Sequence, residues 1–137
     1  CGIEIHITGL EIPLYGYRHF GTRPLSKQVL EDRIGRAGQG YQILLAHNPS
    51  YVNTYKEWGA DLILSGHLHG GIVRIPGIGG VIAPNFHIFP KYSGGIYQED
   101  DVTTVVSKGL GVHSIPIRIM NPAEMIVLNF GEPHTEL

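Results

Sequence analysis

Short segments in which apolar residues alternate with polar residues, or follow one another without a break, mark the expected strands of this chain. The isoleucines of residues 2–8 alternate with Glu4 and His6, which predicts a strand with one apolar and one polar face. Unbroken apolar runs at residues 43–46 and 62–64 predict two further strands, over residues 42–46 and 61–65, that are buried in the core.

Two helices are predicted between these strands. Ser26 is a suitable N-cap for a helix over residues 27–34, and Ser50 for a helix over residues 51–58. A glycine follows each helix at the position where the chain is expected to leave the helical conformation. Because strand, helix and strand follow one another over residues 42–65, this part predicts a βαβ unit with parallel strands.

Beyond residue 70 the pattern changes to short apolar pieces separated by glycines and prolines, which is typical of antiparallel strands and long loops. The pieces lie at residues 72–75, 80–83, 94–98, 102–107 and 125–130. The expected fold class is therefore α/β (α+β), with a mixed sheet and two helices.

The composition agrees with one packed domain or a part of one, and it excludes several classes of function. The chain has 137 residues, of which 42% are hydrophobic and 16% are charged, and its net charge is -2. This charge leaves no basic surface for nucleic acid or for an anionic membrane. No apolar stretch approaches the roughly 18 residues that a membrane-spanning helix needs. A strand pattern follows Cys1 at once, so we expect this start to lie inside a longer polypeptide.

Three histidines follow the two buried strands. His47 comes directly after residues 42–46, and His67 and His69 come shortly after residues 61–65. Carboxyl ends of parallel strands meet at one edge of a sheet, and neighbouring strands lie roughly 4.8 Å apart, so these imidazoles are expected to converge. In an extended backbone His67 and His69 also point the same way, at a spacing suited to two metal ions. The three together predict a metal site, although each histidine alone also suits a hydrogen-bonded structural role.

The predicted metal site lacks carboxylates. Divalent ions carry positive charge that neutral imidazoles do not offset, and hydrolytic sites with two metals normally use carboxylates as well. Asp61 opens the strand that precedes His67 and is expected at the opposite edge, while Glu57 lies on a predicted helix. We therefore expect the anionic ligands to come from polypeptide outside this chain.

Two motifs resemble the last two metal motifs of the calcineurin-like metallophosphoesterases. They are Leu-Leu-Ala-His-Asn-Pro at residues 44–49 and Gly-His-Leu-His-Gly-Gly at residues 66–71, and their order is specific to that family. Further stretches resemble the bacterial YkuE-like branch of the family, at residues 89–92, 107–111, 115–118 and 122–125.

The resemblance implies a fold and a mechanism. Residues 1–137 would form a partial metallophosphoesterase domain, the C-terminal half of a four-layered α/β/β/α sandwich. It implies that His47 and His67 bind one divalent ion and that His69 binds another, with Mn, Fe, Zn or a similar metal at each position. A hydroxide held between the ions would attack the phosphorus of a phosphate mono- or diester.

Three earlier motifs of that family, an Asp-x-His, a Gly-Asp and a Gly-Asn-His, do not occur in this sequence. The resemblance therefore implies that this chain alone is catalytically inactive, and we assign it no catalytic residue. The implied partners are a phosphoester substrate and the N-terminal half of the same domain.

Other loop residues are candidates for contact with the substrate. They are His113, in a glycine-rich stretch, and His87 and Lys91, which flank a Phe-Pro pair. Each of these three residues also suits a structural role in its loop. Arg118 is expected to point outward from an alternating strand, although its guanidinium would also suit a phosphate oxygen.

A second function of a different class stays open on the sequence alone. The chain could be a non-catalytic metal-binding or assembly module that pairs with another chain. It could also form a homo-oligomer through exposed sheet edges, which favour association.

Overall fold

A five-stranded sheet is the main element of the computed structural model, which describes residues 2–13, 25–71, 73–75, 78–82, 90–111 and 117–131. In spatial order its strands are β1 (Ile5–Leu10), β2 (Tyr41–Ala46), β3 (Leu62–Ser65), β7 (Val102–Val106) and β6 (Gly95–Glu99). A separate two-stranded sheet consists of β4 (Val73–Ile75) and β5 (Gly79–Ile82). The helices are α1 (Lys27–Ile34), the short 3-10 helix η2 (Pro49–Tyr51) and α2 (Val52–Trp58).

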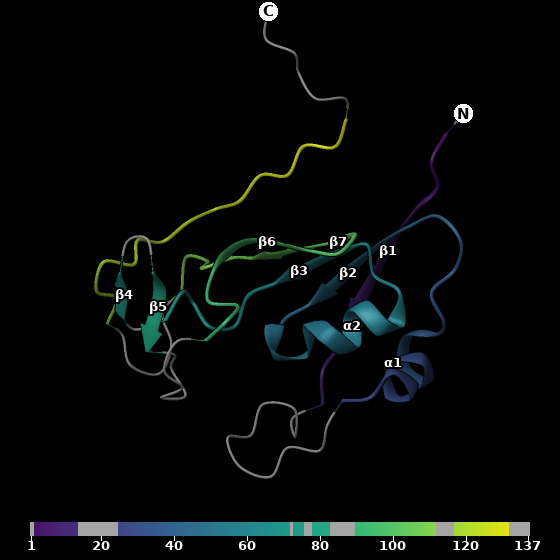
Figure 1. Cartoon of the computed structure of the whole chain (residues 1–137), viewed down its shortest axis with the longest axis horizontal. Coiled ribbons are helices and arrows are strands. Elements are labelled where there is room, and N and C mark those ends of the chain that lie inside the picture. Colours follow the sequence, from purple (N-terminus) through teal and green to yellow (C-terminus); the bar gives the residue numbers. More distant parts are fainter. Residues whose placement is uncertain are drawn as a thin grey trace, which may run out of the picture.

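Strands β1, β2, β3 and β7 run parallel, and the edge strand β6 is antiparallel to β7 (Figure 1). The predicted parallel pairing of residues 42–46 with residues 61–65 is confirmed. Antiparallel pairing beyond residue 70 is confirmed for β4 with β5 and for β6 with β7, but it is wrong for β7 with β3, which is parallel. Strand periodicity is the same in both orientations, so the sequence pattern carries no information on this direction.

The strand predicted at residues 125–130 is wrong. These residues form no strand, and Ile126 and Leu128 instead pack against the sheet from an irregular segment. The strand predicted at residues 2–8 exists but lies further along the chain, as β1.

The prediction of the helix caps is right for α1 and wrong for the second helix. Ser26 caps α1 by accepting a hydrogen bond from the backbone N–H of Val29 at 3.4 Å. At the second helix the cap is Asn48, whose side chain accepts from the N–H of Ser50 at 3.0 Å, and η2 precedes α2. Pro49 explains the shift, because a proline suits the first helical position and so places the cap one residue before it.

Both helices lie on the same face of the sheet and bury the larger core against it (Figure 1). Leu30 of α1 and Tyr55 of α2 are completely buried there, as are Leu44 and Ile63 of the sheet. The Tyr55 hydroxyl donates to the backbone carbonyl of Asn48 at 2.8 Å, which fixes α2 to the end of β2. No helix in the described part of the chain is long and apolar enough to cross a membrane.

The opposite face of the sheet carries a smaller core. Ile43, Leu62 and Val105 are buried at its centre, and Ile126 and Leu128 cover them from the C-terminal segment. In Figure 1 this segment runs along the side of the sheet away from the helices.

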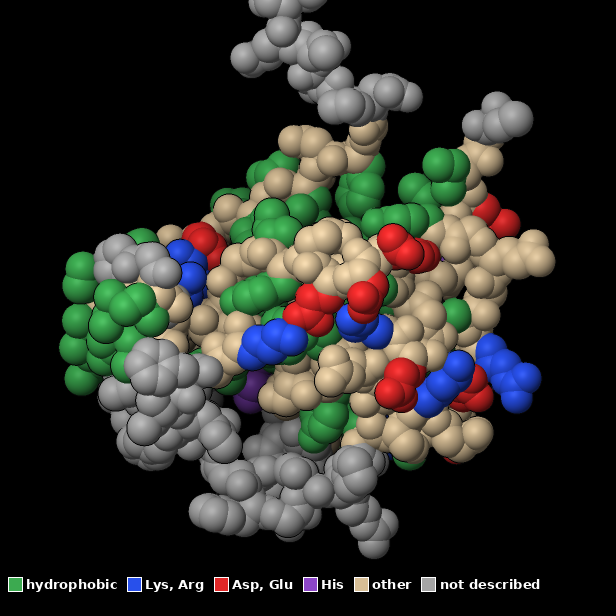
Figure 2. Space-filling model, viewed as in Figure 1, with side chains coloured by type: hydrophobic (Ala, Val, Ile, Leu, Met, Phe, Trp, Pro, Cys, Tyr) green, Lys and Arg blue, Asp and Glu red, His purple; other side chains and the backbone are tan. Residues whose placement is uncertain are grey.

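Toward its outer strands this second face is open to solvent. Ile7 of β1 is 67% exposed, Leu45 of β2 is 42% exposed and Ile96 of β6 is 68% exposed. Figure 2 shows hydrophobic side chains at the surface along the upper side of the molecule, where the C-terminal segment lies in Figure 1. An exposed apolar area of this kind marks an interaction surface.

Candidate metal centre

The carboxyl ends of β2 and β3 are tied together directly after the strands end. The hydroxyl of Ser65 donates to the carbonyl of Ala46 at 2.6 Å, and the N–H of Gly66 donates to the carbonyl of His47 at 3.0 Å. These two bonds continue the pairing of the strands into the loops. They bring the first histidine next to the loop that carries the other two.

The rings of His47 and His67 lie beside each other at this edge. Their centroids are 5.2 Å apart and the ring planes meet at 72°. Two imidazoles that each bind a tetrahedral ion at about 2.1 Å have centroids roughly 5 Å apart, so this spacing fits two ligands of one ion. The predicted convergence of these two histidines is therefore found.

The loop of residues 66–71 is not extended, contrary to the prediction. His67 has φ 64° and His69 has φ 47°, both in the left-handed region that residues with a Cβ atom seldom adopt. Leu68 between them is 8% exposed, so the loop turns tightly around a buried apolar side chain. The pattern His67-Leu68-His69 suits an extended strand as well as a turn, so the sequence did not predict this turn.

His69 faces the loop that follows β7. A Cβ atom added at Gly109 would lie 3.8 Å from its Nδ1 atom, and one added at Gly111 would lie 3.5 Å from its Cε1 atom. Among the residues that the structure describes, no three His, Cys, Asp or Glu side chains form a group that could hold a metal ion. In the described part of the chain, the predicted ligands thus form a pair, His47 and His67, with His69 in the same loop as His67, and the assignment of all three as ligands stays a prediction.

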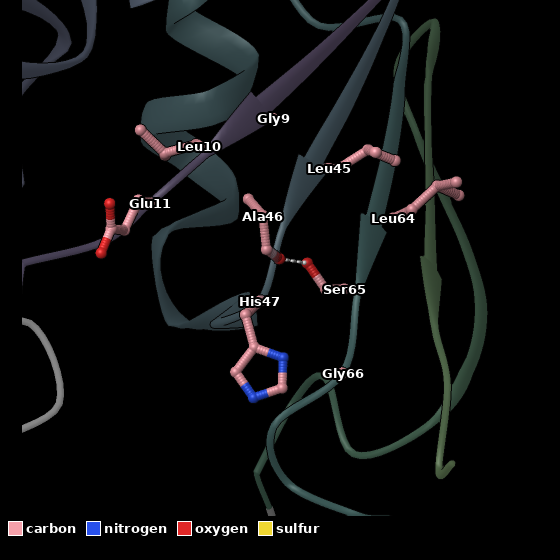
Figure 3. A pocket seen from close by; sticks show the side chains of 9 residues that line it. All are labelled: Gly9, Leu10, Glu11, Leu45, Ala46, His47, Leu64, Ser65 and Gly66. Atoms are coloured by element: carbon pink, nitrogen blue, oxygen red, sulfur yellow. Dashed lines mark hydrogen bonds between the residues drawn. The ribbon is translucent and has the colours of Figure 1, made fainter. Parts of the chain in front are cut away.

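Glu11 is a carboxylate at the same edge that the sequence analysis did not single out. It follows β1, and the register that pairs Leu10 with Ala46 brings it beside His47. Both Glu11 and His47 line an open pocket at the ends of β1, β2 and β3 (Figure 3). The Glu11 side chain is exposed, and in Figure 3 its carboxylate points away from the imidazole. The sequence would have pointed to Glu11 if the end of β1 had been placed correctly, because β1 ends later in the chain than predicted.

Of the three candidates for substrate contact, the structure describes only Lys91, and it places Lys91 away from the histidines. The ammonium of Lys91 pairs with the carboxylate of Glu99 at 2.6 Å, and Glu99 ends β6 at the edge where the parallel strands begin. This ion pair holds the pKa of Lys91 above its usual value and, with the Tyr92 hydroxyl, the pKa of Glu99 below its usual value. His87 and His113 lie outside the described residues.

Arg118 points inward, contrary to the prediction. Its Nη2 atom donates to backbone carbonyls of the loop after β7, and its Nε and Nη1 atoms are buried with no hydrogen-bond partner among the residues that the structure describes. It therefore belongs to the surroundings of the candidate site and not to an exposed strand face.

Comparison with known proteins decides the family. The chain is 32% identical over 127 residues, 92% of its length, to the uncharacterized metallophosphoesterase YkuE of Bacillus subtilis. An uncharacterized metallophosphoesterase of Helicobacter pylori is 37% identical over 92 residues, 63% of this chain. The chain belongs to the metallophosphoesterase family. A further relative, the phosphodiesterase YaeI of Escherichia coli, is 42% identical over 43 residues, 31% of this chain.

The chain corresponds to only part of each of these three relatives. It spans 40% of the length of YkuE, 22% of the Helicobacter protein and 16% of YaeI. No family model and no solved structure matches the chain. Members of this family use divalent metals, so the imidazole pair fits the family in the type of its donors.

Proposed function

We propose that this chain forms the distal half of a phosphoesterase active site, at which phosphate mono- or diesters are hydrolysed with two divalent ions bound at the carboxyl edge of the sheet. The observation that carries the proposal is the approach of the His47 and His67 rings to 5.2 Å at the ends of two adjacent parallel strands. This edge is where open α/β sheets bind their ligands.

The histidines of this chain would share the ions between them. His47 and His67 would hold one ion and His69 the other, and imidazole ligands favour Mn, Fe, Zn or a similar metal over magnesium. When bound, such ions supply a hydroxide as nucleophile and stabilise charge on the phosphoryl oxygens. The imidazoles contribute neutral nitrogen donors whose positions the loop backbone fixes.

The chain alone is proposed to be inactive. Within its described residues no group of three possible ligands occurs, and the exposed Glu11 carboxylate is directed away from His47. Neutral imidazoles leave the charge of the ions uncompensated, so carboxylates from the remainder of a longer protein would complete the site.

The open face of the sheet supports the same proposal. Ile7, Leu45 and Ile96 are large apolar residues whose exposure disfavours a stable isolated sheet. Since YkuE is considerably longer than the matched region, we propose that the rest of the domain packs on this face and completes a four-layered sandwich.

An assembly module is the second candidate function. The same open face and the edge strands would suit a second copy of the chain or a separate partner chain. Substitutions that add a charge test whether the chain associates through this face. Ile7→Lys and Leu45→Lys lie at exposed positions, so the chain should stay folded while association through the face is prevented. Light scattering of the chain alone detects a homo-oligomer, and co-purification with an added N-terminal half detects the proposed domain partner.

Turnover of a model phosphoester tests the enzymatic proposal. The chain alone and the chain joined to the segment that precedes it in its gene are each supplied with Mn²⁺ and bis-p-nitrophenyl phosphate. We expect turnover only from the longer protein, and its loss on substitution of His67 and His69 by alanine. His6→Ala is the matched control, because His6 lies near the opposite end of β1. Turnover that survives removal of both His67 and His69 would refute the proposal.

A further inference from the structure

Three polar side chains within residues 117–124 bind the two loops that surround His69. We call Arg118, Asn121 and Glu124 the clasp. None of the three was assigned a role in the predicted metal site, and each makes its contacts to backbone or side-chain atoms of residues close to His69.

Asn121 holds the loop of residues 66–71, which we call the histidine loop, through two of its carbonyl groups. It is 2% exposed, and its Nδ2 atom donates to the carbonyl of His69 at 2.6 Å and to the carbonyl of Gly71 at 2.7 Å. His69, Gly70 and Gly71 have φ values of 47°, 77° and 88°. Left-handed backbone at a residue with a Cβ atom persists only where its surroundings fix it. The Asn121 amide ties the first and the last of these three residues together.

Arg118 gathers the loop on the other side of the imidazole. Its Nη2 atom donates to the carbonyls of Lys108 at 3.0 Å and Gly109 at 3.3 Å, and also to the carbonyl of Gly111. The His69 ring lies against the same backbone, at Gly109 and Gly111. A change in this loop would therefore change the space that the ring occupies.

Glu124 fixes the start of that loop. Its carboxylate accepts from the N–H of Lys108 at 2.9 Å and pairs with the Lys108 ammonium at 2.8 Å, while its own N–H donates to the carbonyl of Gly109 at 3.2 Å. The Lys108 side chain is 14% exposed and packs on the histidine loop, since a Cβ atom at Gly70 would lie 2.8 Å from its Cγ atom.

We propose that the clasp is a set of positioning residues that hold the His69 imidazole in one orientation for metal binding. The proposal rests on the proposed function, in which His69 is a ligand. The clasp acts through the backbone of residues 69–71 and through the loop at residues 108–111, and it touches neither metal nor substrate. Groups that orient a ligand without binding the metal typically change metal affinity by about 10- to 100-fold.

Nuclear magnetic resonance of the histidine rings tests the clasp without any metal. In Asn121→Ala and Arg118→Lys we expect the ring signals of His69 to shift and broaden, while those of His47 stay in place. His47 is a suitable internal reference because its backbone is held by Gly66 and not by the clasp.

Matched controls carry the same substitutions at exposed positions on the helices. Asn53→Ala and Arg33→Lys should leave every ring signal unchanged. If Asn121→Ala does not fold, Arg118→Lys still decides the question, since it keeps the charge but replaces a planar donor group by a single ammonium. A folded clasp variant with an unmoved His69 signal would overturn the proposal.

Cobalt titration separates positioning from stability. We expect about tenfold weaker Co²⁺ binding in Asn121→Ala than in the unaltered chain, and little further loss when Asn121→Ala is added to His69→Ala. Equal losses with and without His69 would show that the clasp affects stability alone, and would overturn the proposal. Absence of any Co²⁺ binding by the chain would count against the proposed metal site, while the ring signals would still decide on the clasp.

Discussion

The imidazole of His67 meets the imidazole of His47 edge to face, although 19 residues separate the two histidines along the chain. The contact is created by the backbone, because the N–H of Gly66 donates to the carbonyl of His47 and His67 then adopts φ 64°. The backbone of the two loops thus brings the two rings to the spacing expected of two ligands of one ion.

Substitution of either member of this pair should abolish most metal binding by the chain. We expect His47→Ala and His67→Ala each to weaken Zn²⁺ binding at least about tenfold, because a single remaining imidazole binds the ion more weakly than two imidazoles together. Isothermal titration calorimetry measures the effect, with His6→Ala as the control. A variant of either residue with unchanged affinity would place the ion elsewhere.

The cap of the second helix is Asn48 in the structure but Ser50 in the sequence prediction, and substitution of each residue tells the two apart. Asn48→Ala should lower the free energy of unfolding by about 1 to 2 kcal/mol, because the buried Asn48 side chain accepts from the N–H of Ser50. Ser50→Ala should be nearly neutral, since Ser50 is exposed. Urea unfolding of the two variants compares them, and a larger loss for Ser50→Ala would restore the cap predicted from sequence.

Much of the fold was predictable because it is encoded locally. The buried strands β2 and β3 and the helix α1 with its Ser26 cap follow from apolar periodicity and cap chemistry. The parallel direction of β7 was not predictable, because it depends on docking against β3 and not on any local pattern.

The candidate site was predictable in its residues but not in its detail. Placement of His47 and His67 after parallel strands was enough to bring them together. The left-handed turn at His69 depends on Asn121, 52 residues away, and no local pattern encodes such a contact. Glu11 was missed because β1 ends two residues later than its alternation suggested.

The Lys108 to Glu124 ion pair predicts a loss of stability in acid. Burial alone would raise the pKa of Glu124, but hydrogen bonds from the Lys108 ammonium and backbone N–H, and the charge of Arg74, outweigh it and lower the pKa. A lowered pKa in the folded state stabilises the protein above the unfolded value of about 4.3, and this contribution is lost as the pH falls through the folded value.

Glu124→Gln isolates this contribution. At pH 7 the variant should be less stable by about 1 kcal/mol, because the partly exposed pair keeps a hydrogen bond but loses its charge. At a pH below the folded pKa of Glu124 the difference should shrink, because the natural glutamate is then also neutral. Urea unfolding of both proteins across this range measures it, and a difference that stays constant with pH would contradict the expectation.

The role predicted for Lys91 from the sequence differs from the role that the structure gives it. The sequence made it a candidate for substrate contact, whereas the structure pairs it with Glu99, which also binds the Tyr92 hydroxyl at 2.9 Å. Because Glu99 ends β6 at the edge away from the histidines, Lys91→Ala should leave kcat/KM for a model phosphoester unchanged in the longer protein. Its effect on stability should be small, since the Lys91 side chain is 65% exposed. Steady-state kinetics test this prediction. A tenfold rise in KM with an unchanged kcat in Lys91→Ala would show that the Lys91 ammonium binds substrate after all. In that case Glu99→Gln would be expected to strengthen substrate binding, because it releases the Lys91 ammonium from its ion pair.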